Sequence, residues 1–225
     1  MTFTFVTLFP NLIKPYFCDS ILKRAVESRF ISYEFFNPRE FTTNKHNKVD
    51  KQMVGGGAGM LMTPQPLFDC IDKIKEENKD AYIVFPLAAA KPFRQNDAKR
   101  LAKKRNIVFV SGRYEGIDER VIEKYANEVF SIGEYVLTGG ELPSIVMADA
   151  IARNVKGVLG NQDSLVEESY ETTLLEAPSF TKPENFQNLS VIKEYLKGNH
   201  SKISDLKFQM SNCKTKYYRP NKEKR

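Results

Sequence analysis

Runs of apolar residues along the chain predict five β-strands. Residues 2–9 alternate apolar and polar positions, as a strand with one buried face does. Residues 81–86 and 107–111 are almost continuously apolar and rich in β-branched side chains, a pattern typical of strands buried on both faces of a parallel sheet. Two further strands are expected at residues 31–36 and 128–132.

Helical patterns alternate with these strands. Helices are expected at residues 19–29, 64–78, 96–104, 118–125 and 143–154. Asp19 or Ser20 would cap the first, and Pro64 lies in the first turn of the second. Residues 37–62 lack clear periodicity and predict a loop around a cluster of glycines. Strands that alternate with helices predict an α/β fold.

The chain changes character after Val155. Residues 157–183 are polar, with acidic residues in the middle and no long helical signal, which favours a linker or mobile lid. Ile203, Leu206 and Met210 then recur at helical spacing in a basic segment. We therefore predict three parts: an α/β domain over residues 1–160, a linker or lid over 161–190, and a basic helical domain over 191–225.

Positive charge is concentrated at the end of the chain. The net charge is +6, and residues 193–225 hold ten Lys or Arg against three Asp or Glu, whereas the other 192 residues sum to −1. A neutral body with a basic tail indicates a polyanionic partner, of which nucleic acid is the simplest. A solvated terminus that improves solubility explains the same charge equally well, so charge alone leaves both interpretations open.

Composition and motifs exclude several classes of protein. Hydrophobic residues make up 41% and charged residues 28%, as in ordinary globular proteins, and the longest apolar run, residues 83–90, is far shorter than a membrane span. The start of the chain lacks the basic and apolar regions of a secretory signal. Three separated cysteines and two histidines argue against a zinc site or a disulfide framework, so we expect a reduced, cytoplasmic protein. Phosphate-loop, dinucleotide-binding, zinc-protease and α/β-hydrolase motifs are absent.

Three glycine-containing segments are candidates for chemistry. Residues 55–60 read GGGAGM, a run that exposes backbone N–H groups but that alone favours a flexible turn over an anion cradle. Residues 112–120 read GRYEGIDER after a predicted buried strand, where ligands bind in α/β proteins, although a solvated ion-pair network explains the same charges. Residues 131–143 read SIGEYVLTGGELP, in which two glycines allow a sharp turn before a helix. None of the three is specific by itself.

Read in order with NPR at 37–39, VD at 49–50 and GVLG at 157–160, these segments resemble the bacterial tRNA (guanine-N1)-methyltransferase family over nearly the whole chain. The resemblance implies a knotted SPOUT methyltransferase, in which an α/β domain with a parallel sheet and a deep trefoil knot binds S-adenosylmethionine and a small helical domain binds tRNA. It also implies a homodimer with active sites at the subunit interface. The implied reaction methylates N1 of the guanine 3′-adjacent to the anticodon when another guanine precedes it, and depends on Mg²⁺ without a dedicated protein cage.

The resemblance also assigns site residues. The expected cofactor-binding residues are Gly112, Ile132, Gly133, Glu134, Tyr135, Val136, Leu137, Gly139 and Gly140. Arg153 matches the family's catalytic arginine, which would stabilise the negative charge that develops on guanine O6 when N1 loses its proton. An ion pair with Asp149, four residues earlier on the predicted helix, is the structural alternative.

Two of the departures from the family pattern concern the active site. Where the family has an aspartate as general base, this chain has Glu168, which needs a raised pKa, through burial or through Glu167, to act as an effective base. Glu115 and Asp163 are lesser candidates for this role. The turn that helps to wall the cofactor pocket reads LAAA at residues 87–90, where the family has Ser-Pro-x-Gly.

Five basic residues near the end of the chain are expected to contact tRNA phosphates. They are Lys202, Lys207, Lys214, Lys216 and Arg219. Two rival functions stay open at this point: methyl transfer to a different RNA site, and tRNA binding with weakened or lost catalysis through the changes at residues 88–90 and 168.

Overall fold

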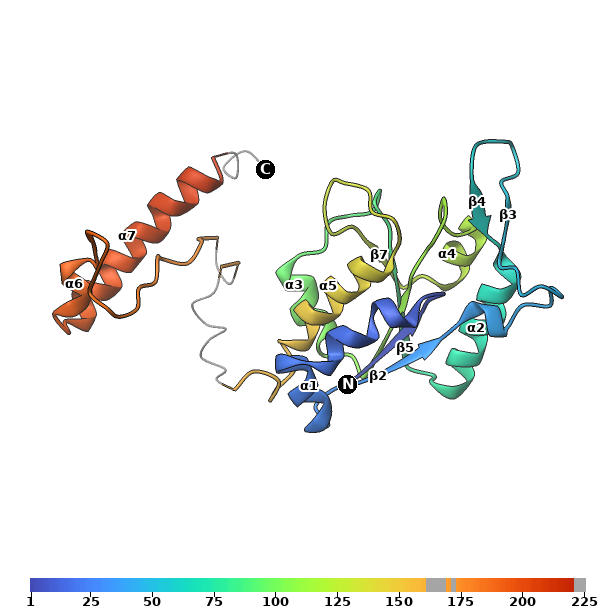
Figure 1. Ribbon diagram of the computed structural model, residues 1–225, viewed down its shortest axis with the longest axis horizontal. Helices are drawn as coiled ribbons and strands as arrows, with labels where there is room; N and C mark the ends of the chain where they lie inside the picture. The colour runs from blue at the N-terminus through green and yellow to red at the C-terminus, as the bar shows by residue number, and fades with distance from the viewer. Residues whose placement is uncertain (161–168, 171–172, 221–225) are drawn as a thin grey trace. The chain divides into compact units, whose positions relative to one another are not determined.

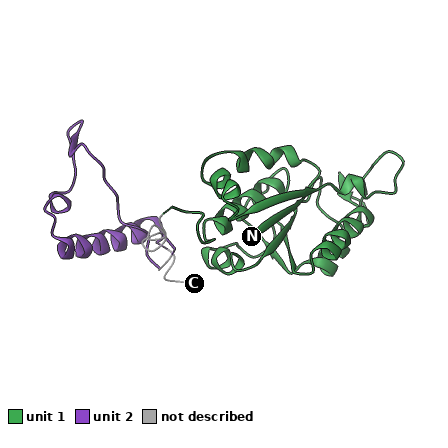
Figure 2. Ribbon diagram, turned by 90° about the horizontal axis from the view of Figure 1, so that it is seen from below, with its two compact units in different colours: residues 1–160 green, residues 161–225 purple. Residues whose placement is uncertain are grey.

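A computed structural model describes residues 1–160, 169–170 and 173–220 (Figure 1). The chain divides into two compact units, Met1–Gly160 and Asn161–Arg225 (Figure 2). The predicted α/β class is confirmed for the first unit, in which helices surround one parallel sheet.

The first unit is built on a sheet of five parallel strands in the order β2-β1-β6-β5-β7. The strands are β1 (Thr2–Val6), β2 (Ser32–Phe36), β5 (Ala81–Pro86), β6 (Asn106–Val110) and β7 (Glu128–Phe130). The apolar runs of β1, β5 and β6 place them in the middle of the sheet, whereas β2 and the three-residue β7 form its edges. This order brings the carboxyl ends of β5, β6 and β7 together.

Helices cover both faces of the sheet (Figure 1). Alternate residues of β5 show why: Val84 packs in one apolar cluster, whereas Ile83 and Phe85 pack in the other. The first cluster includes residues of α1 (Ser20–Glu27), α3 (Gln95–Leu101) and α5 (Glu141–Ala152). The second includes residues of α2 (Pro64–Glu77) and α4 (Glu119–Tyr125). Strands buried on both faces must be apolar at every position, which explains the continuous runs in the sequence.

The segment expected to be a loop at 37–62 contains more structure than predicted. Pro38–Glu40 forms a 3-10 turn, and β3 (Asp50–Gln52) pairs with β4 (Met60–Met62) as an antiparallel hairpin around the glycine run. Gly55, Gly56, Gly57 and Gly59 have φ between +87° and +117°, backbone conformations that glycine adopts easily. Strands of three residues are too short to produce a detectable alternation, so the sequence pattern missed them.

Other boundaries also differ from the prediction: α1, α3 and β7 end two to three residues early, at Glu27, Leu101 and Phe130. The first strand ends at Val6, and two short 3-10 helices at Pro10–Leu12 and Lys14–Cys18 follow, because a proline opens or lies near the start of each. The helix α5 begins at Glu141, two residues before the expected start at Pro143.

The second unit consists of a short hairpin, a short helix and one long helix. Its elements are the hairpin strands β8 (Asn185–Phe186) and β9 (Leu189–Ser190), and the helices α6 (Lys193–Leu196) and α7 (His200–Tyr218). The Asn199 side chain caps α7 by accepting a hydrogen bond from the Lys202 N–H at 3.2 Å. The Leu175 N–H donates to the Thr215 hydroxyl at 2.8 Å, so the chain before the hairpin also contacts α7.

No helix among the described residues is long and apolar enough to cross a membrane. The longest, α7, has 19 residues, and none of them is buried.

Candidate active site

A pocket of about 200 Å³ lies at the carboxyl ends of β5, β6 and β7. Its lining comes from residues 86–88 after β5, 112–117 after β6 and 130–143 after β7. In open α/β sheets, ligands bind at this edge because the loops there converge around a crevice. Eight of the nine expected cofactor residues line this pocket: Gly112, Ile132, Gly133, Tyr135, Val136, Leu137, Gly139 and Gly140. The ninth, Glu134, is exposed and is not part of the lining.

Two glycines hold the centre of the pocket wall together. The Gly140 N–H donates to the Gly112 carbonyl at 2.9 Å. A Cβ atom added to Gly140 would lie 2.8 Å from the Gly112 nitrogen and from the Ser111 Cα, both backbone atoms that cannot move aside easily. The first residues of α5 can therefore reach the end of β6 only if residue 140 has no side chain.

A buried pair of serines supports this contact. The Ser144 hydroxyl donates to the Gly140 carbonyl at 2.7 Å and lies 3.0 Å from the Ser111 hydroxyl. Both serines are almost fully buried. The Gly140 carbonyl also accepts the Ser144 N–H at 3.0 Å, so the serine hydroxyl adds a second hydrogen bond at the first turn of α5.

The first two glycine segments of the sequence meet at the pocket. The Glu115 N–H donates to the Met60 carbonyl at 2.9 Å, and the Met62 N–H donates to the Gly116 carbonyl at 3.0 Å, so β4 runs along the loop after β6. The Glu115 side chain packs against Gly59, where an added Cβ would come within 2.5 Å of it. Glu115, one of the expected catalytic residues, thus lies at the wall of the pocket.

The loop after β5 forms another part of the wall, although it departs from the family pattern. Leu87 and Ala88 line the pocket. The Leu87 N–H donates to the Phe130 carbonyl at 2.9 Å, and the Phe93 N–H donates to the Ser131 carbonyl at 2.8 Å. These backbone hydrogen bonds attach both ends of the loop to Phe130 and Ser131 at the end of β7. They do not depend on the side chains of the loop.

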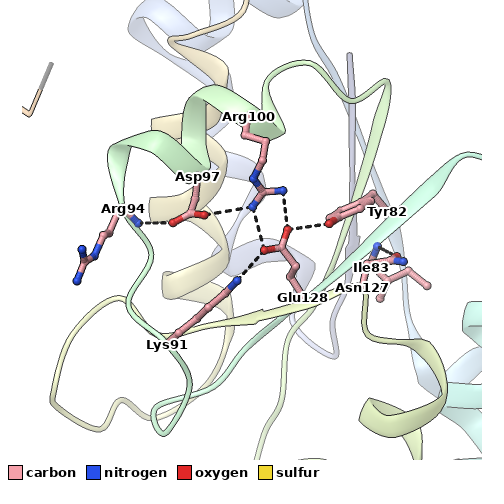
Figure 3. Close-up of polar contacts among 8 residues, drawn as sticks. All are labelled: Tyr82, Ile83, Lys91, Arg94, Asp97, Arg100, Asn127 and Glu128. Carbon is pink, nitrogen blue, oxygen red and sulfur yellow. Dashed lines mark hydrogen bonds and ion pairs between the residues drawn. The ribbon is translucent and has the colours of Figure 1, made fainter.

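Glu128 on β7 is the centre of a polar network behind this loop (Figure 3). Its carboxylate accepts hydrogen bonds from the Tyr82 hydroxyl at 2.7 Å, from the Lys91 ammonium at 2.9 Å and from the Arg100 guanidinium at 2.9 Å. Burial raises the pKa of Glu128, but the hydrogen bonds from Arg100, Lys91 and Tyr82 outweigh it and lower the pKa to about 2. The network ties β5, β7 and α3 together at the open edge of the sheet.

Arg153 lies away from the pocket in its own chain. It is the residue at the carboxyl end of α5, beside a separate cavity of about 290 Å³ that Tyr16 and Asp149 also line. Gly140 is at the other end of the helix, roughly 20 Å away at 1.5 Å per residue. The Tyr16 hydroxyl donates to Asp149 at 2.6 Å, and this hydrogen bond, together with burial, raises the pKa of Tyr16. The structure thus does not bring Arg153 to the cofactor pocket of the same chain.

Glu168, the expected base, lies outside the described residues, as do Glu167 and Asp163. Among the described residues no group of three His, Cys, Asp or Glu side chains could hold a metal ion.

The expected RNA-binding residues lie on α7 and at its end. At about 100° per residue, Lys207 and Lys214 share one face of the helix and Lys202 and Lys216 share another. Arg219 ends the helix, and its guanidinium stacks over the Tyr170 ring with 4.2 Å between the guanidinium carbon and the ring centroid. The five residues therefore do not form a single stripe.

Tyr114, Phe130 and Pro143 also line the pocket but were not among the expected cofactor residues. Tyr114 and Pro143 belong to two of the candidate glycine segments and Phe130 ends the strand before the later of them, so position in these segments is the signal that could have found them.

Comparisons with known proteins identify the family. The sequence model described as tRNA (Guanine-1)-methyltransferase TrmD matches residues 1–225. A protein named tRNA (guanine-N(1)-)-methyltransferase from Sulfurovum sp. (strain NBC37-1) is 67% identical over 220 residues, which cover 98% of this chain and 97% of that protein. Proteins with the same name from Sulfurimonas denitrificans and Campylobacter curvus are 65% and 62% identical, with 98% of this chain covered and 95% and 93% of theirs.

The match spans the whole chain, including the segments that form the pocket at the ends of β5, β6 and β7. The chain therefore belongs to the tRNA (guanine-1)-methyltransferase TrmD family.

Proposed function

We propose that this chain is a tRNA (guanine-N1)-methyltransferase that transfers a methyl group from S-adenosylmethionine to N1 of the guanine 3′-adjacent to the anticodon. The names of its relatives support the reaction. The observation that carries the proposal is the pocket itself, because it assembles the glycine segments of the sequence at the carboxyl ends of three parallel strands.

The pocket fits the methyl donor. Apolar side chains of Ile132, Val136 and Leu137 suit a flat adenine ring, and the backbone between Gly139 and Gly140 leaves no side chain in the way of the ribose and the amino-acid part. Bound there, S-adenosylmethionine supplies an electrophilic methyl group on a sulfonium ion.

Arg153 is proposed to stabilise the negative charge that develops on guanine O6 in the transition state. Guanine N1 carries a proton at neutral pH, and its removal places negative charge on O6. A guanidinium donates hydrogen bonds to such an oxygen and is never deprotonated in a protein, so it lowers the energy of the transition state.

Glu168 is proposed to accept the N1 proton. A glutamate has the same carboxylate as the family's aspartate, one methylene further from the backbone. Glu115 is the second candidate, and its position at the pocket wall favours a role near the reacting atoms. An effective base requires a pKa above the ordinary value for glutamate.

A homodimer explains the position of Arg153. In one chain this residue and the proposed cofactor pocket lie at opposite ends of α5, which supports a site that the arginine of a second copy completes. Leu142 and Val146 on α5 are 54% and 43% exposed, and Val136 in the pocket loop is 85% exposed. Exposed apolar side chains near the pocket suit an interface between copies.

The second unit is proposed to bind tRNA. Residues 191–225 form the basic helical domain, with Lys202, Lys207, Lys214, Lys216 and Arg219 as phosphate contacts, and residues 161–190 act as the linker. Phosphate contacts position the substrate, and base contacts near the pocket select the guanine.

The remaining expectations belong to the same proposal. We propose the trefoil knot that the family resemblance implies, and the return of the chain after β7 to the end of β6, where Gly140 meets Gly112, is compatible with it. We propose that Mg²⁺ assists through carboxylates and substrate phosphates rather than through a dedicated cage. A tRNA substrate favours a cytoplasmic location.

Methyl transfer to defined RNA tests the function. Labelled S-adenosylmethionine would be incubated with a tRNA transcript that has guanine at the last anticodon position and at the next position, and with a control transcript that has adenine at the second of these. The proposal expects transfer to the first transcript alone. Transfer to both transcripts would mean that the methyl group goes to a different nucleotide. Transfer to neither would contradict the proposed methyltransferase activity.

A further inference from the structure

A buried ion pair lies behind the wall of the pocket. Glu141, the first residue of α5, is 2% exposed, and its Oε2 atom lies 2.8 Å from the Nε atom of Arg113. Neither atom has another hydrogen-bond partner in the described part of the chain. The other carboxylate oxygen of Glu141 accepts a hydrogen bond from the Thr7 hydroxyl at 2.8 Å, so the carboxylate is held from two sides.

Arg113 connects this pair to the pocket loop. Its Nη1 atom donates to the Thr138 carbonyl at 3.3 Å. Its Nε atom lies so close to Gly139 that an added Cβ on the glycine would approach it to 2.6 Å. On another side the guanidinium stacks on the Phe9 ring, 4.6 Å from its centroid. The side chain of Arg113 therefore lies against two consecutive residues of the loop, Thr138 and Gly139.

Arg113 and Glu141 are each adjacent in the sequence to a glycine of the pocket wall. Arg113 follows Gly112 and Glu141 follows Gly140, and these glycines form the hydrogen bond at the centre of the pocket wall. Neither charged residue lines the pocket itself. Any effect that they have on a bound molecule must act through the loop.

Much of the pocket loop, residues 132–140, is exposed and makes few other packing contacts. Tyr135 is 55% exposed, Val136 is 85% exposed and Leu137 is 38% exposed, although all three line the pocket. A segment with so little packing loses conformational entropy when a ligand orders it, and an anchor that orders it beforehand improves affinity. Because burial of charges is costly, an ion pair of this kind adds little net stability compared with apolar side chains of the same size.

We propose that Arg113 and Glu141 are positioning residues that hold residues 138–140 in the conformation that binds S-adenosylmethionine. The proposal rests on the cofactor role of the pocket stated above. It assigns the ion pair to cofactor affinity, whereas the methyl-transfer step itself uses other residues.

Two variants in the full-length protein test this role. Arg113→Met keeps the length of the side chain and removes the charge, and Glu141→Gln keeps its shape. Each is expected to raise the Kd for S-adenosylmethionine about tenfold, to raise KM for it in parallel, and to leave kcat at saturating cofactor within about twofold. Arg113→Lys keeps the charge but loses the planar contacts, so an intermediate Kd is expected.

A stability control separates positioning from a merely structural role. Ile74→Ala leaves a cavity under α2, in the apolar cluster on the opposite face of the sheet from α5. Hydrogen exchange of residues 132–140, measured without cofactor, should rise in Arg113→Met and not in Ile74→Ala.

Two results would overturn the inference: wild-type cofactor affinity and wild-type exchange in both ion-pair variants, or an equal loss of affinity in Ile74→Ala. If the wild-type protein did not bind S-adenosylmethionine at all, the proposed function would fail, and the exchange of residues 132–140 would still decide whether the ion pair anchors the loop.

Discussion

Gly140 shows how closely the candidate site depends on a single residue. Its amide bonds to Gly112, and its missing side chain lets the start of α5 touch the backbone at the end of β6. Gly140→Ala is therefore expected to open the pocket wall and to raise the Kd for S-adenosylmethionine by at least about tenfold. Isothermal titration would measure it, with Gly160→Ala as control, because an added Cβ there meets nothing within 4 Å.

Substitution of Arg153 is expected to reduce turnover and to leave the affinity for the cofactor unchanged, the opposite of Gly140→Ala. Because it lies away from the pocket of its own chain, Arg153→Ala should bind S-adenosylmethionine as the wild-type protein does. Its turnover should fall by about 10²–10³, the usual cost of removing a group that stabilises a developing oxyanion. Loss of cofactor binding or of folding in this variant would instead show that the arginine is structural.

Glu168 and Glu115 can be distinguished by conservative variants. Glu168→Gln should reduce turnover by about 10²–10⁴, the usual contribution of a general base, whereas Glu168→Asp should keep part of the activity. Single-turnover assays with excess enzyme would measure the chemical step. A fully active Glu168→Gln would move the base elsewhere, with Glu115→Gln as the next variant.

At the scale of elements, β7 depends on its side chains more than the other strands do. It has three residues and lies at the edge of the sheet, and Glu128 joins it to Lys91 and Arg100 (Figure 3). Glu128→Gln should lower the free energy of unfolding by about 2 kcal/mol at neutral pH, because the hydrogen bonds to a charged carboxylate are lost. Glu123→Gln, an exposed carboxylate on α4, is the matched control.

The pH dependence of this effect follows from the pKa of Glu128. Its value of about 2 in the folded protein is below the ordinary 4.5, so the carboxylate stabilises the fold fully above about pH 4.5. The stabilisation is lost as the pH falls toward 2. Urea unfolding of both proteins at several pH values should show their difference shrinking across this interval, and a constant difference would contradict the role of the charge.

The elements with long or strongly apolar patterns were predictable from the sequence. The strands β5 and β6 and the helix α2 lie within one or two residues of the predicted ranges, because burial on both faces and a proline-started helix leave clear signals. The hairpin of β3 and β4 was not predictable, since backbone bonds to the 115–118 loop, and not its own periodicity, hold it. The Arg113–Glu141 pair was missed because its partners are 28 residues apart in the sequence.

At the scale of the whole molecule, the central claim is that two copies of the chain complete each active site. The sequence could single out the proposed cofactor loop and Arg153 as candidates, but a linear pattern gives no distance between them. The proposal of a second copy rests on the helix α5, which separates the pocket from Arg153 within one chain.

Complementation between two impaired variants tests this claim most directly. Gly140→Ala has a disrupted pocket and keeps Arg153, and Arg153→Ala lacks the arginine and keeps the pocket. The assay keeps S-adenosylmethionine well below the raised Kd of Gly140→Ala, so that neither variant alone transfers appreciable methyl. When equal amounts are co-expressed, mixed dimers should contain one intact site each, so methyl transfer should return to about a quarter of the wild-type level. If the mixture stays as inactive as either variant alone, pocket and arginine do not come from different chains, and the account of a shared active site is wrong.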